Sequence, residues 1–150
     1  MRMRFSLALA VAAIVAGGAS PQAVETCHYI NAEGIGSLTS PTTTESRIIG
    51  GGLIHGSTTA DLVFTGSEGA IFFFEGTLTL TTRQGTLSLD IIDGVFDTST
   101  GEFSSGSTAT GGTGRFDGAT GSLYFHGFVL ADGVTFIDDE ISGHICLELP

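Results

Sequence analysis

The chain has 150 residues, enough for one domain, and carries 16 acidic residues against five arginines and no lysine. A chain this acidic lacks the cations that bind nucleic-acid phosphates or anionic membrane surfaces, so its composition argues against both partner classes. Its 41% hydrophobic content suffices for a packed core, and 23 glycines with three prolines are typical of strands joined by tight turns.

Residues 1–23 have the pattern of a secretory signal peptide. Arg2 and Arg4 supply a positive start, and a ten-residue apolar run and several small residues follow. The apolar run is about half the ~20 residues that a membrane-spanning helix needs. We predict cleavage after Ala19 or Ala23, and a secreted or periplasmic protein with no membrane span after processing. The mature chain would keep three arginines and 16 acids, a formal charge of −13.

The two cysteines, Cys27 and Cys146, lie near opposite ends of the mature chain. In an oxidising compartment an isolated pair is most simply a disulfide. A bridge across about 120 residues stabilises by roughly 4–5 kcal/mol on the chain-entropy model. We therefore predict this disulfide, which requires the first and last strands to be neighbours.

No helical periodicity follows the predicted signal peptide; short alternating runs bounded by Gly, Asp, Ser and Thr predict strands instead. In chain order these strands span residues 28–31, 47–56, 60–66, 71–82, 86–93, 101–110, 122–130 and 135–149, with a polar connector at 40–46. We predict an all-β domain over residues 27–150. A meandering, antiparallel eight-stranded barrel suits the pattern because closure removes the sheet edges, and a two-sheet sandwich is the alternative.

Each long strand has one apolar face and one face that mixes polar and aromatic groups. The mixed faces carry four candidate catalytic side chains: Glu75, Tyr124, His126 and His144. If these faces point inward, the four form an acid/base set in a partly apolar cavity. If they point outward, the four belong to a solvated surface around a filled core. We favour the outward orientation because eight-stranded barrels are often just wide enough to fill themselves.

A glycine-rich segment, residues 111–121, is the most distinctive part of the chain. Its glycines allow positive φ and close packing; they are Gly111, Gly112, Gly114, Gly118 and Gly121. Phe116 is expected to plug one barrel end, and Arg115 to be solvated or to pair with a carboxylate. A phosphate-binding loop would need a helix next, whereas residues 122–130 resemble a strand.

This segment, GGTGRFDGATG, resembles the glycine-rich hairpin of dirigent proteins and of allene oxide cyclases. The run IFFFEGTLTL at 71–80 and its distance to GGTG are also similar to their layout. The resemblance implies a small calycin-like eight-stranded barrel. Where dirigent proteins usually have Ala-Arg-Gly-Tyr, this chain has Ala119-Thr120-Gly121-Ser122, and serines precede GGTG in place of a glutamate-containing strand. No catalytic residue of either family is therefore carried over.

The sequence offers no metal or cofactor motif. Its histidines, two of which are His28 and His55, show no short HxH or HxxxH spacing, and both cysteines are assigned to the disulfide. The acidic run 138–140 lacks the glycine and alternating ligands of an EF-hand loop, so we expect it to be solvated. No Gly-x-Ser-x-Gly elbow indicates a covalent nucleophile.

Three functions fit these observations. The first is an exported barrel that binds a small hydrophobic or phenolic molecule, which the 11 phenylalanines favour. The second is a cofactor-independent cyclase or isomerase of the dirigent type that steers a reactive intermediate by shape. The third is a structural envelope module with a filled barrel. An open pocket of roughly 300 Å³ or more would favour the first two.

The resemblance also implies a homo-oligomer, because both families assemble as trimers. Large apolar groups on the mixed faces, Phe73 and Phe128, give independent support, since such groups usually mark an interface.

Overall fold

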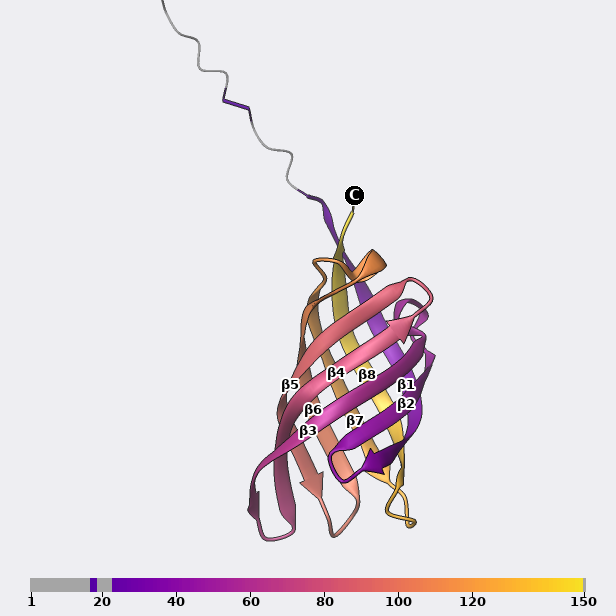
Figure 1. The fold of residues 1–150 in the computed structure, drawn as a ribbon, viewed down its shortest axis with the longest axis vertical. Coiled ribbons are helices and arrows are strands. Elements are labelled where there is room, and N and C mark those ends of the chain that lie inside the picture. Colours follow the sequence, from indigo (N-terminus) through magenta and orange to yellow (C-terminus); the bar gives the residue numbers. More distant parts are fainter. Residues whose placement is uncertain (1–16, 19–22, 150) are drawn as a thin grey trace, which may run out of the picture.

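The structure, a computed structural model, describes residues 17–18 and 23–149. The chain forms a closed antiparallel barrel of eight strands in sequential order (Figure 1). The strands are β1 (Glu25–Ser40), β2 (Thr43–Gly50), β3 (Gly56–Glu68), β4 (Ile71–Thr82), β5 (Gly85–Asp97), β6 (Glu102–Gly112), β7 (Thr120–Val129) and β8 (Thr135–Glu148). Two 3₁₀ turns, η1 (Gly52–Ile54) and η2 (Gly114–Phe116), complete the fold. The predicted all-β barrel is confirmed, and the alternative sandwich is not observed.

Most of the predicted signal peptide, residues 1–16 and 19–22, lies outside the described residues, so its cleavage stays a prediction. In the part of the chain that the structure describes, no helix is both long and apolar enough to cross a membrane.

The first strand is far longer than its sequence pattern indicates. Alternation predicts only residues 28–31, whereas β1 continues to Ser40 through Gly34 and Gly36. A side chain at Gly36 would collide with the Phe136 ring and the Glu45 carbonyl, so glycine is needed for β1 to pass between its neighbours. Conversely, the expected strand 47–56 ends at Gly50, where three consecutive glycines with positive φ lead into η1.

The predicted Cys27–Cys146 disulfide is confirmed. The two cysteines are direct register partners where β1 pairs with β8, the last pairing needed to close the barrel. The bond therefore joins the two ends of the chain across the seam of the sheet.

The apolar faces of the strands point into the barrel. Along β4, Phe74, Leu78 and Leu80 are buried and alternate with exposed residues such as Glu75. The mixed faces point outward, because closure packs the apolar face of every strand against the others and removes it from water.

One end of the barrel is filled. This end carries the start of β1, the end of β8 and η2 (Figure 1). Leu80, Leu87, Leu147 and the η2 residue Phe116 are each at most 2% exposed there. Each such side chain contributes about 1.5–3 kcal/mol of burial free energy, so the filled end supplies much of the stability that the fold requires.

Candidate functional site

The other end of the barrel contains a cavity of about 190 Å³ that opens between the loops. All eight strands contribute side chains to its wall. The inward positions here carry small side chains, such as Ser46, Ala60 and Ser105, where the filled end has leucine and isoleucine. The cavity is smaller than the ~300 Å³ expected of a typical pocket for a drug-sized ligand.

Aromatic rings are the most frequent side chains of the cavity wall. They belong to Phe74, Phe96, Phe103, Phe125 and Phe136. The rings of Phe103 and Phe136 meet edge to face, with centroids 5.8 Å apart and planes at 87°. Such pairs favour fixed relative orientations, so this part of the wall is preorganised.

A second aromatic pair lies at the cavity mouth. The Phe64 ring packs edge to face on Phe72, with centroids 6.1 Å apart, and both residues remain partly exposed. Phe64 also lines the cavity. The apolar surface of the interior therefore extends onto the rim.

The polar groups of the wall are few. The hydroxyls of Ser46 and Thr58 are 2.5 Å apart and hydrogen-bond each other, so they are satisfied without a ligand. Among the residues that line the cavity, Asp138 is the only ionisable one.

Asp138 is an isolated carboxyl in an apolar wall. It is 5% exposed, and both of its register partners are glycines, Gly34 on β1 and Gly127 on β7. A Cβ at Gly34 would lie 2.7 Å from Oδ2 of Asp138, so glycine leaves the space that the carboxyl occupies. Burial, and then the charge of neighbouring Asp139, raise the pKa of Asp138 to about 7.

The expectation that residues 138–140 form a solvated run is wrong for Asp138. A β-bulge explains the error, since Asp139 and Glu140 both point outward while Asp138 and Ile141 point inward. The available signal was the alternation from Phe136, which places Asp138 on the inner face.

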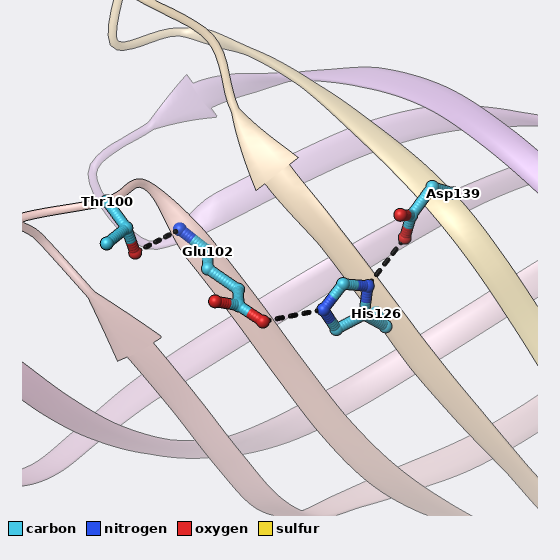
Figure 2. Close-up of polar contacts among 4 residues, drawn as sticks. All are labelled: Thr100, Glu102, His126 and Asp139. Atoms are coloured by element: carbon cyan, nitrogen blue, oxygen red, sulfur yellow. Dashed lines mark hydrogen bonds and ion pairs between the residues drawn. The ribbon is translucent and has the colours of Figure 1, made fainter.

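His126 lies on the outer face of β7, at the level of Asp138. Figure 2 shows its ring between two carboxylates. Its Nε2 is 2.8 Å from Oε1 of Glu102, and its Nδ1 is 2.6 Å from Oδ1 of Asp139. The Phe128 ring packs edge to face on the imidazole, with centroids 5.3 Å apart. The hydrogen bonds to Glu102 and then to Asp139 raise the pKa of His126 above its ordinary value.

The four candidate catalytic side chains do not meet in the cavity. Glu75 and His144 are exposed on the outside of β4 and β8. Tyr124 is 42% exposed and lines a shallow outer groove beside Tyr29. Because all four point away from the barrel axis, two of them from β7 and one each from β4 and β8, the structure does not unite them into an acid/base set in the cavity.

The glycine-rich hairpin lies at the filled end, away from the cavity. Phe116 is fully buried there, and a side chain at Gly112 would collide with it and with the Thr86 carbonyl. Arg115 is exposed and donates a hydrogen bond from Nη1 to Oε1 of Gln84, at 2.8 Å. The hairpin therefore has a structural place in this barrel.

Comparison with known proteins identifies no family: no protein-family model matches the chain, and no curated protein matches it. Within residues 17–18 and 23–149, no group of three or more His, Cys, Asp or Glu side chains is arranged to hold a metal ion. The cavity with Asp138 combines an apolar wall with one buried carboxyl, an arrangement that is suited to bind a small molecule.

Proposed function

We propose that this protein is an exported barrel that binds a small, neutral, hydrophobic molecule whose hydrogen-bonding group faces Asp138; a phenol is the prime candidate. One observation carries the proposal: a cavity walled by phenylalanine holds a single buried carboxyl that makes no hydrogen bond to the other described residues. Such convergence of an apolar wall with one polar group is typical of small-molecule sites.

The size of the cavity limits the ligand. A dry cavity of about 150 Å³ suffices for benzene, so 190 Å³ suits one substituted ring. A longer ligand would extend through the mouth onto Phe64 and Phe72, whose rings are partly exposed.

The charge of the site favours a neutral ligand. The lining contains no cation, and the whole chain has a formal charge of −11. A carboxylate ligand would therefore meet repulsion and an uncompensated desolvation cost. A phenolic hydroxyl suits Asp138 in both protonation states, since it accepts from the acid and donates to the carboxylate.

Export is supported by the signal-peptide pattern and the disulfide, which is stable in oxidising compartments. The resemblance to dirigent proteins and allene oxide cyclases supports the same assignment to a small-molecule barrel.

A cofactor-independent isomerase or cyclase is the second candidate. The raised pKa of Asp138 favours it, because a group that titrates near neutrality is suited to general acid–base catalysis. In this candidate the cavity orients a reactive intermediate and Asp138 moves the proton.

Calorimetric titration with p-cresol, toluene and benzoate tests the binding proposal. We expect the mature protein to bind p-cresol more tightly than toluene and to reject benzoate. Ala60→Phe, which fills the cavity, should lower the affinity for p-cresol at least tenfold. Asp138→Asn should reduce only the preference of the protein for p-cresol over toluene. Glu75→Gln on the outer face is the matched control. Failure of every single-ring ligand, or equal binding by Ala60→Phe, would overturn the proposal.

A further inference from the structure

The cluster on the outer face of the barrel requires a charged histidine. Both ring nitrogens of His126 lie within 2.8 Å of a carboxylate oxygen, of Glu102 on one side and Asp139 on the other. A neutral imidazole has only one N–H, so one nitrogen would turn a lone pair towards an anionic oxygen. The imidazolium donates both hydrogen bonds and is the form that fits this geometry.

The bulge in β8 places this cluster next to the cavity carboxyl. On β7, His126 is opposite Glu140 and Gly127 is opposite Asp138, so Asp139 is the extra residue. Asp139 thus turns outward to His126 while its chain neighbour Asp138 turns inward to the cavity. Two consecutive residues of β8, Asp138 and Asp139, therefore face opposite sides of the barrel wall.

The charges around this position are few and can be named. Glu102 from β6 and Asp139 and Glu140 from β8 face His126, and Glu33 of β1 lies opposite the bulge. Inside, Asp138 faces no other ionisable group of the lining. His126 therefore provides the positive charge nearest to Asp139 in this cluster.

We propose that His126 and Asp138 form a proton-linked pair across the barrel wall, joined by Asp139, in which the outer imidazolium shifts the balance between the neutral and the ionised form of the cavity carboxyl. His126 is then a positioning residue for charge, since it does not touch the ligand. The relevance to binding rests on the proposed function, but the linkage itself does not require a ligand.

The physical reason is electrostatic. The negative charge of Asp139 favours the protonated form of Asp138, and the imidazolium offsets this charge. When His126 loses its proton, the proton affinity of Asp138 rises, so this carboxyl stays neutral to higher pH. Because linkage is reciprocal, the effect of each group on the proton affinity of the other is equal.

Carbon-13 NMR of the side-chain carboxyls, in the mature protein without ligand, tests the linkage directly. We expect His126→Gln to raise the pKa of Asp138 by about half a unit, since the amide keeps hydrogen-bond donors but removes the charge. Asp139→Asn should lower it, because this change removes the negative charge between the two groups. By reciprocity, Asp138→Asn should lower the pKa of His126, which tests the same linkage independently if His126→Gln does not fold.

The matched control is His144→Gln, which removes a different outward histidine, on β8, and should leave the pKa of Asp138 unchanged. A purely structural role of His126 would not produce opposite shifts in His126→Gln and Asp139→Asn. An unchanged or lowered pKa of Asp138 in folded His126→Gln would overturn the proposal.

Acetophenone gives a readout that depends on the ligand. Its carbonyl accepts hydrogen bonds only, so its affinity should fall as Asp138 ionises. We expect the midpoint of this pH profile to be about half a unit higher in His126→Gln than in wild type. An identical midpoint would contradict the proposal. No binding of acetophenone at any pH would count against the proposed function, while the NMR shifts would still decide the linkage.

Discussion

At the scale of single residues, Asp138 makes stability depend on pH. The folded carboxyl has a pKa of about 7, against roughly 3.9 in an unfolded chain. Between these values the folded protein binds more protons than the unfolded one, so stability falls as pH rises from about 4 to about 7. The raised pKa of His126 acts in the same direction, because the contribution of this group to stability is complete below about pH 6.5 and is lost as the pH rises above that value.

Asp138→Asn should therefore remove part of this pH dependence. At pH 8 the wild-type protein contains a buried carboxylate, and three pKa units correspond to about 4 kcal/mol as an upper value. We expect the variant to have the higher free energy of unfolding at pH 8 and no such advantage at pH 4, measured by urea denaturation. Asp61→Asn, at an exposed position of β3, is the control. A pH profile of Asp138→Asn that parallels wild type would contradict this prediction.

At the scale of elements, the two ends of the barrel have different roles: one is packed and the other holds the cavity. The 3₁₀ turn η2 inserts Phe116 into the filled end, where it packs against β5 and β6. The mouth holds Phe64, which is 47% exposed. The same residue type thus serves stability at one end and the open cavity at the other.

Truncating each of these two phenylalanines should distinguish the contributions of the two ends to stability. Phe116→Ala leaves a cavity in a packed core and should lower the free energy of unfolding by about 3–5 kcal/mol. Phe64→Ala is the matched variant and should cost less than about 1 kcal/mol, because the ring is half exposed. Thermal and urea unfolding measure both, and comparable losses would show that the closed end does not carry the stability.

The β1–β8 seam depends on its covalent bond as well as its pairing. Replacing both cysteines, Cys27→Ala with Cys146→Ala, should lower the free energy of unfolding by about 2–4 kcal/mol, since the disulfide constrains the unfolded chain. Urea denaturation compares this variant with the oxidised wild type. Thiol titration of the unreduced, denatured protein should find no free thiol, and a stability equal to wild type would contradict the expected contribution.

At the scale of the whole molecule, the outer surface carries large apolar groups. Tyr29 is 92% exposed, Ile92 50% and Phe128 40%, whereas Phe73 is partly buried. Exposed groups of this size usually mark an interface. The high negative charge opposes self-association, but physiological salt screens it beyond ~8 Å.

We therefore expect a homo-oligomer in solution, and the family resemblance favours a trimer. Light scattering at low and physiological salt should give the mass of a trimer at the higher salt, and Tyr29→Lys should shift it towards the monomer. Thr77→Lys, at an exposed position of β4, adds the same charge elsewhere as a control. A monomer under both conditions would contradict the prediction and weaken the resemblance.

Much of the fold could be predicted from the sequence because it depends on local pattern. The period-two alternation of Phe74, Leu78 and Leu80 is itself the condition for a strand with one buried face. Two cysteines in a chain that is predicted to be exported have one possible partner each, so Cys27–Cys146 also followed from the sequence alone. Long-range packing decided the rest, as the length of β1 shows, where Gly34 and Gly36 interrupt the apolar pattern but continue the strand.

The cavity and its buried carboxyl were decided by tertiary structure. Alternation forward from Phe136 places Asp138 inside, and alternation backward from Ile141 places Asp139 inside instead. Only the bulge, formed as β8 pairs with both β1 and β7, resolves this conflict. The cavity likewise depends on which side chains meet across the closed barrel, because small residues leave space only where their neighbours on other strands do not fill it. A sequence pattern reports the faces of one strand, whereas a cavity is a property of eight strands packed together.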